Sequence, residues 1–191
     1  MDTLTVVNEM LGTLGEVELA SLTDYHPYLS NALSTLDRIN RTAQSVPRWF
    51  NQEDATLTPN VVDSFIYLPN DLLEIDACKA EYVQRGGRLY NTKTGSYVFT
   101  EPVTLSIRRL IEFEDLPETA AAYIAAEAVL QFQSNYDGDS AKRQEKAGWR
   151  DNCFTIFQAE DTRKRKVNLL DNNPRLWRIK RATQRLRGWT G

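Results

Sequence analysis

The first 47 residues carry apolar side chains at helical spacing in two segments. In residues 4–14 the repeat consists of Val6, Val7, Met10, Leu11 and Leu14, and Gly15 is expected to end the helix. A second helix is expected to start at Asp24, as its N-cap, and to end before Pro47. Its apolar stripe consists of Leu29, Ala32, Leu33, Leu36, Ile39 and Ala43. The pattern predicts an antiparallel helical pair over residues 1–47.

The period changes to two in the middle of the chain, which is rich in β-branched and aromatic residues and is interrupted by Gly and Pro. Tyr90 and Tyr97 flank a TKTG turn in which Gly95 supplies a positive φ, a typical hairpin signal. Farther on, apolar and polar residues alternate strictly over residues 103–108, as in a half-buried strand. The pattern predicts a small antiparallel sheet of four or five strands within a β-rich insertion, residues 48–112.

Helical spacing returns after Pro117. The segment up to Gln133 is apolar on all sides and contains six alanines, which is typical of a helix that neighbours cover all round. Asp139 is the expected N-cap of a fourth helix, with an inward face of Trp149, Cys153, Ile156 and Phe157. Residues 113–167 therefore form the second helical half. The predicted fold class is α+β: an antiparallel bundle of two N-terminal and two C-terminal helices, an inserted antiparallel β lobe, and an extended basic tail over residues 168–191.

Charge is distributed unevenly along the chain, although the formal net charge is only −3. Residues 1–160 contain 13 Lys and Arg against 24 Asp and Glu, whereas residues 161–191 contain 10 against two. The basic stretch also carries tryptophan and aliphatic side chains, and aromatic anchors among arginines are typical of protein interfaces. We interpret it as a docking segment. Its candidate contact residues are Arg163, Lys164, Arg165, Lys166, Leu176, Trp177, Arg178, Ile179 and Trp189.

The reactive side chains give little support for an enzyme. The chain has one histidine, His26, which excludes a histidine pair for a metal and is expected to cap or pack at a helix start. Cys78 and Cys153 lack the spacing of a zinc site and are interpreted as reduced core thiols. No phosphate-binding glycine motif or serine-hydrolase motif occurs. Neither a cofactor nor a metal is expected.

Two alternatives stay open at this point. A carbohydrate-active protein needs only two carboxylates, and acidic clusters occur at Glu53/Asp54, Asp71/Glu74/Asp76 and Glu112/Glu114/Asp115. A sequence-independent DNA-binding protein would use the basic segment, although the acidic remainder of the chain opposes contact with phosphates. The longest apolar-rich run, residues 120–132, is too short to cross a bilayer. With no signal-peptide pattern at the N-terminus, a soluble, non-exported protein is expected.

Four blocks of sequence take the interpretation further. They are LTVVNEMLGTLGEVELASL (4–22), ALSTLDRINRTAQSVPRWFNQE (32–53) with TLTPN (56–60), YVQRGGRLYNTKTGSYVF (82–99) and LSIRRLIEFEDLPETAAAYIAAEAVLQFQ (105–133). In this order they resemble the tail tubular protein A family, the head–tail adaptors or gatekeepers of short-tailed, podovirus-type bacteriophages. The resemblance covers about residues 4–148.

The resemblance implies a structural protein of the virion tail that is assembled in the host cytoplasm. It implies helices with a β lobe and twelve copies in a ring, with the portal protein above, a tubular nozzle below and tail fibres attached at the joint. It also implies a mechanical role: retaining packaged double-stranded DNA, which passes through the channel without sequence-specific binding. Within this frame, the basic segment is expected to dock on the portal. The β lobe is expected to face the nozzle and fibres through Arg88, Tyr90, Lys93 and Tyr97.

Overall fold

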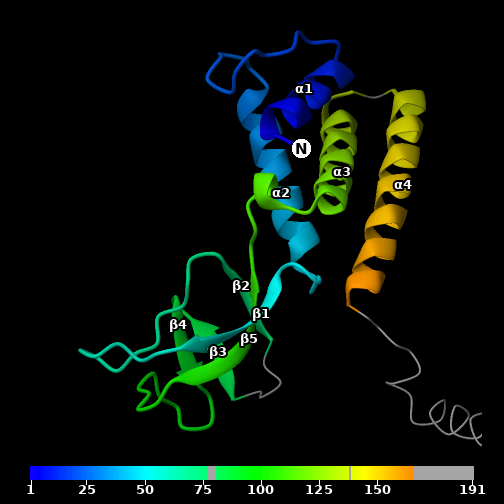
Figure 1. The fold of residues 1–191 in the computed structure, drawn as a ribbon. Helices are drawn as coiled ribbons and strands as arrows, with labels where there is room; N and C mark the ends of the chain where they lie inside the picture. The colour runs from blue at the N-terminus through cyan, green and yellow to red at the C-terminus, as the bar shows by residue number, and fades with distance from the viewer. Residues whose placement is uncertain (77–80, 138, 166–191) are drawn as a thin grey trace, which may run out of the picture.

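The computed structural model describes residues 1–76, 81–137 and 139–165. In these ranges the elements are α1 (Thr3–Thr13), α2 (Leu29–Gln44), β1 (Gln52–Leu57), β2 (Leu72–Asp76), β3 (Tyr82–Arg85), β4 (Arg88–Asn91), β5 (Val103–Arg109), the 3-10 turn η1 (Phe113–Asp115), α3 (Glu118–Tyr136) and α4 (Ser140–Lys164). Figure 1 shows that α1–α4 form one part of the molecule, the helical part, and that β1–β5 form another, the β lobe. The predicted α+β class is confirmed.

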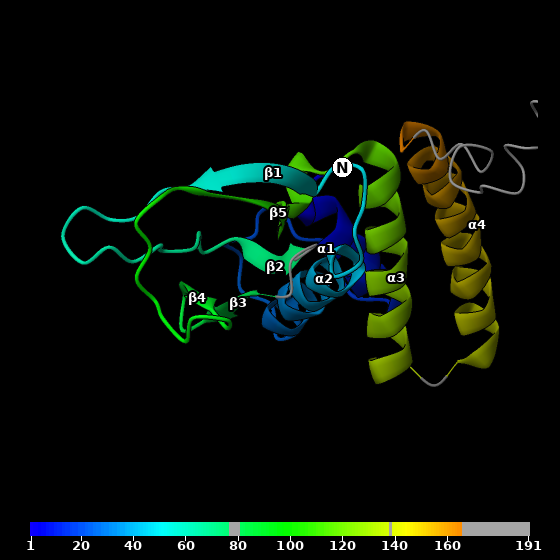
Figure 2. The ribbon, with the colours of Figure 1, turned by 90° about the horizontal axis from the view of Figure 1, so that it is seen from below.

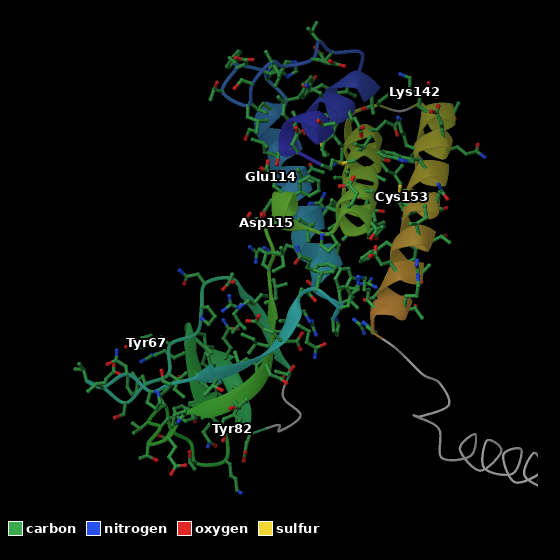
Figure 3. The ribbon with its side chains drawn as sticks, viewed as in Figure 1. Tyr67, Tyr82, Glu114, Asp115, Lys142 and Cys153 are labelled. Carbon is green, nitrogen blue, oxygen red and sulfur yellow. The ribbon has the colours of Figure 1, made fainter. Side chains whose placement is uncertain are left out.

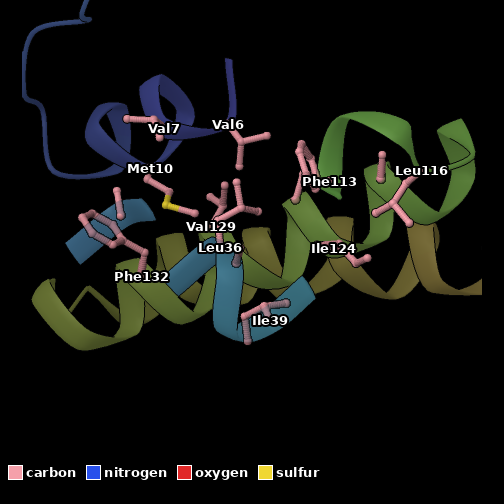
Figure 4. Packing of buried hydrophobic residues seen from close by; sticks show 14 of the residues in the cluster. Val6, Val7, Met10, Leu36, Ile39, Phe113, Leu116, Ile124, Val129 and Phe132 are labelled. Carbon is pink, nitrogen blue, oxygen red and sulfur yellow. The ribbon is translucent and has the colours of Figure 1, made fainter. Parts of the chain in front are cut away.

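Helix α3 is the centre of the helical part. It packs against α1, α2 and α4, and none of its residues from 120 to 133 is exposed. The expectation that this helix is covered all round is therefore confirmed. The largest core side chains around it, seen in Figure 4, include Met10, Leu36, Ile124, Val129 and Phe132. Five alanines of α3 belong to the buried core as well, and their small side chains let the neighbouring helices approach closely.

Helix α2 starts four residues later than the sequence predicted, because its N-cap is Tyr28 and not Asp24. Asp24 does not cap it: its carboxylate accepts a hydrogen bond from the Ser21 N–H within the preceding turn. The helix begins at Leu29, and its N-cap, Tyr28, makes no side-chain capping bond. His26 does cap locally, since its Nδ1 accepts the Tyr28 N–H at 3.3 Å. The apolar stripe itself is confirmed, because all six of its residues belong to the helical core.

The strands form two small sheets rather than the single sheet that was predicted. The first has the order β1-β5-β2, with both neighbours antiparallel to β5, and the second is the hairpin β3-β4. Gly86 and Gly87 make the turn of that hairpin with φ of 57° and 71°, values that only glycine adopts readily. The core between the sheets consists of Ile66, Leu68, Leu72, Ile75, Leu89, Phe99, Leu105 and Ile107.

Helix α4 lies against α3, as Figures 1 and 2 both show. Asp139 caps its N-terminus as predicted, accepting the N–H groups of Ala141 and Lys142. The predicted inward face is wrong in part, because Ile156 is half exposed and Cys153 is only partly buried. Trp149 and Phe157 do face the core as predicted, and Phe154, which the prediction left out, packs against it as well. Cys78 lies outside the described residues.

Candidate interaction surfaces

The basic end of α4 contains three of the residues that the sequence assigned to docking. Arg163 is exposed. Lys164 places its Nζ 5.2 Å from the centre of the Trp49 ring, and the Nε of Arg165 donates to Asp161 at 3.0 Å. Two of the three basic side chains therefore already have partners within the chain. The other assigned residues lie outside the described ranges: Lys166, Leu176, Trp177, Arg178, Ile179 and Trp189.

Asp161 fixes this end of α4 to the turn that follows α2. Its Oδ2 accepts a hydrogen bond from Arg48 Nη1 at 3.2 Å, and its Oδ1 accepts the Trp49 N–H at 3.1 Å. The Arg48 and Asp161 side chains are each only 12% exposed, and the Arg48 guanidinium lies 4.7 Å from the centre of the Phe157 ring. The contact is thus a largely buried ion pair, which is costly to break from one side.

Gln44 forms the junction between the helical part and the β lobe. Its side chain is fully buried, its Nε2 donates to the Ile111 carbonyl at 2.8 Å, and its Oε1 accepts the Ile111 N–H at 2.9 Å. Asn51 continues the contact, donating from Nδ2 to the Gln44 carbonyl and accepting the Arg109 N–H at its own carbonyl. The chain entering the lobe and the chain leaving it are therefore hydrogen-bonded to the same helix end.

Two arginines on β5 reinforce the junction. Arg108 is buried, and its Nη1 donates to the Ser45 carbonyl and to Glu74 Oε2, the latter at 2.8 Å. Arg109 forms ion pairs with Glu53 at 2.8 Å and Asp71 at 3.2 Å. Two of the acidic clusters considered for carbohydrate chemistry thus contribute carboxylates that pair with these arginines across the sheet.

The β lobe brings together three of the four residues that the sequence placed on its outer face. The Arg88 guanidinium lies 4.7 Å from the centre of the Tyr97 ring, and the Tyr90 and Tyr97 ring centres are 4.8 Å apart. Arg85 adds a further layer, 4.0 Å from the centre of the Tyr90 ring. All three predicted residues in this stack are half-buried. Lys93 does not join it and lies exposed in the turn after β4.

A surface that sequence reasoning missed lies beside this stack. The valine loop, residues 58–64, connects β1 to the segment before β2 and carries Val61 and Val62, which are 99% and 94% exposed. Figure 3 shows Tyr67 at the base of the loop. Its hydroxyl donates to Asp63 Oδ2 at 2.7 Å, and this bond, with the Phe65 N–H, holds the pKa of Asp63 below its ordinary value. The sequence signal was adjacent valines between turn-forming residues, a pattern that also fits a strand.

A groove of about 690 Å³ lies between α1, the loop that follows it and the first turns of α4. Its lining includes Glu9, Glu18, Gln133, Lys146 and Trp149. Burial raises the pKa of Glu9, and Lys146 offsets this only in part. Glu9 Oε2 has no hydrogen-bond partner among the described residues. Folding therefore favours the protonated, neutral form of the Glu9 carboxyl over the charged form.

Replacing Glu9 by Gln is expected to raise the melting temperature at about pH 7. A carboxyl whose pKa is raised by folding favours the folded state at low pH and opposes it once the pH exceeds the ordinary value of 4.5. The gain over the wild type should therefore shrink as the pH falls toward 4.5. Thermal melts across that range measure it, with Glu145→Gln on the exposed rim of the same groove as a control. A lower melting temperature for Glu9→Gln at neutral pH would contradict the burial argument.

The described residues contain no group of three or more His, Cys, Asp and Glu side chains that could hold a metal ion. Within the same ranges, no helix is both long and apolar enough to cross a bilayer. What the chain does present is a rigid junction between two parts with different outer surfaces. Two joined parts, each with its own exposed surface, suit the class of protein that works through contacts with other proteins.

Comparisons with known proteins agree with that class. The model of the family described as tail tubular protein matches residues 4–178, and the chain belongs to this family. Tail tubular protein A of Klebsiella phage KP34 is 35% identical over 143 residues, which cover 73% of this chain and 76% of that protein. The resemblance seen in the sequence is thereby confirmed, and the family match extends past residue 148. The chain is a structural component of a bacteriophage tail.

Proposed function

We propose that the chain is the head–tail adaptor of its virion. Twelve copies form a ring between the portal protein and the tail nozzle, retain the packaged DNA and line part of the ejection channel. The observation that carries this proposal is the junction built around Gln44, whose fully buried side chain couples the helical part to the β lobe through two hydrogen bonds to Ile111. An adaptor has to hold two different partners at a fixed distance, and a rigid junction between two chemically distinct parts serves that purpose.

In this arrangement the helical part packs against neighbouring copies, and the basic segment beyond α4 docks on the portal. The β lobe faces the nozzle and the tail fibres. A deletion of residues 88–100 would remove the predicted contact residues of the lobe, but it would also remove Leu89 and Phe99 from the core of the lobe. Such a deletion would unfold the lobe, so point substitutions at exposed positions are the appropriate test.

The channel is expected to have a negatively charged lining. Residues 1–160 carry an excess of 11 acidic side chains, and the turn between the β lobe and α3 exposes Glu112, Glu114, Asp115 and Glu118. Figure 3 shows Glu114 and Asp115 on the outer side of the helical part. Carboxylates repel the DNA backbone, so DNA passes without the phosphate contacts that lysine and arginine make.

Electron microscopy of the purified chain mixed with the portal protein of the same phage tests the proposal. The expected result is a second ring of twelve subunits stacked on the portal, with an acidic lumen. The chain incubated without the portal is the control for self-assembly. Failure to decorate the portal, or a lumen lined mainly by lysine and arginine, would contradict the proposal.

A further inference from the structure

The valine loop combines two properties that rarely occur together at a protein surface. Its two central side chains are apolar and almost fully exposed, and Asp63 is the only charged residue between Leu57 and Asn70. Single exposed apolar residues are common, but an adjacent pair at the tip of a protruding loop is typical of a contact site. In both Figure 1 and Figure 2 the loop projects from the β lobe away from the helices.

Hydrogen bonds hold this loop in one shape. Asn60 closes it at three points: its N–H donates to the Phe65 carbonyl, its carbonyl accepts the Ser64 N–H, and its Oδ1 accepts the Val62 N–H at 2.8 Å. Ser64 completes the turn with a φ of 59°, and its carbonyl accepts the Phe99 N–H from the lobe. The two valines are therefore presented by an ordered backbone, and a partner that binds them loses little conformational entropy.

The arginine–tyrosine stack, formed by Arg85, Arg88, Tyr90 and Tyr97, lies next to the base of the valine loop. Arg88 contacts the Phe65 ring at 5.1 Å as well as the Tyr97 ring, and Tyr67 forms a backbone bridge with Arg88 while its hydroxyl holds Asp63. These aromatic side chains are engaged with one another and with the loop's own residues. The valines, in contrast, make no such contact and remain at the surface. Arg88 and Tyr97 are thus positioning residues for the loop.

We propose that Val61 and Val62 are the anchor by which the chain holds the next protein of the tail, through a small apolar pocket on that protein. The inference rests on the proposed adaptor function and names the contact on its tail side. The location of the loop supports this partner, because it lies on the opposite side of the molecule from α4 in Figures 1 and 2. In the proposed arrangement the basic segment that follows α4 docks on the portal, which leaves the opposite side for the tail.

The test is the full-length double variant Val61→Asp/Val62→Asp. The variant removes two valines that would be buried in the complex. It is therefore expected to weaken binding to the purified nozzle protein of the same phage by about 100-fold, measured by biolayer interferometry. Phage particles complemented with this variant should carry the adaptor ring but lack the nozzle in electron micrographs. The melting temperature should stay at the wild-type value, because neither side chain is buried.

Two further variants complete the test. Val17→Asp changes a valine that is 80% exposed in the loop after α1, and it should bind the nozzle protein like the wild type. Val61→Ile/Val62→Ile should also retain binding. Wild-type nozzle binding by the Asp variant would overturn the inference. A folded Asp variant that fails to join the heads would overturn it too, since the loop would then contact the portal or a neighbouring copy. If the wild-type chain itself does not bridge heads and nozzles, the proposed adaptor function is wrong, and the proposed valine anchor is wrong with it.

Discussion

A chain truncated after Val167 is expected to fold normally and to lose its attachment to portal-bearing heads. Phe157, Asp161 and Lys164 hold the end of α4 against the rest of the described chain, and all three remain in the truncated protein. The removed segment contains two tryptophans and six of the ten basic residues beyond Glu160. Losing one tryptophan anchor typically costs about 2 kcal/mol or more of binding free energy, and a ring multiplies the effect by the number of its copies.

Cosedimentation of the truncated chain with heads measures this loss, and a thermal melt verifies the fold. The matched control is the full-length variant Trp177→Ala/Trp189→Ala, which keeps every charge of the segment. If that variant also fails to attach, the tryptophans carry the contact, whereas attachment at high affinity would assign it to the basic residues. Wild-type attachment by the truncated chain would show that the segment is only a solvated terminus.

Replacing Asp161 by Ala is expected to lower the free energy of unfolding by about 3 kcal/mol, or the melting temperature by about 10 °C. The variant leaves the guanidinium of Arg48, whose side chain is 12% exposed, without its carboxylate, and it also removes the acceptor of the Trp49 N–H. Breaking one side of a largely buried ion pair costs far more than removing both partners.

Asp151→Ala is the matched control for this substitution. Asp151 lies on the same helix, is 70% exposed and pairs only with its neighbour Arg150, so its removal should change stability by less than about 0.5 kcal/mol. Urea unfolding of both variants makes the comparison. Equal stability of the Asp161 variant and the wild type would show that the end of α4 is not held by this contact.

The sequence predicted the elements that have a clear period. The apolar stripe of α2, the all-round cover of α3 and the Asp139 cap depend on residues three or four positions apart, so local spacing encodes them. The start of α2 was misplaced because Asp24 has an equally good local alternative, a turn closed by the Ser21 N–H. The single sheet was wrong because strand period does not reveal which strands pair.

The interaction surfaces were harder to predict from the sequence than the helices and strands. Gln44, Asn51 and Asp161 matter through partners 58 to 113 positions away in the sequence, and such pairing leaves no local pattern. Arg108 looked like the solvent side of an alternating strand, yet the end of α2 covers it. Arg88, Tyr90 and Tyr97 do lie together, but they contact one another within the lobe. Their predicted contact with the nozzle or fibres stays a prediction.

The ion pair at Asp161 also fixes the position at which α4 ends. Because α4 runs for 25 residues, about 37 Å, its pinned end lies at the waist of the molecule beside the junction. Residues 166–191 start from this point and have a contour length of about 90 Å. Under the proposed docking on the portal, the Asp161 ion pair therefore sets the point from which each copy of the chain reaches toward the head.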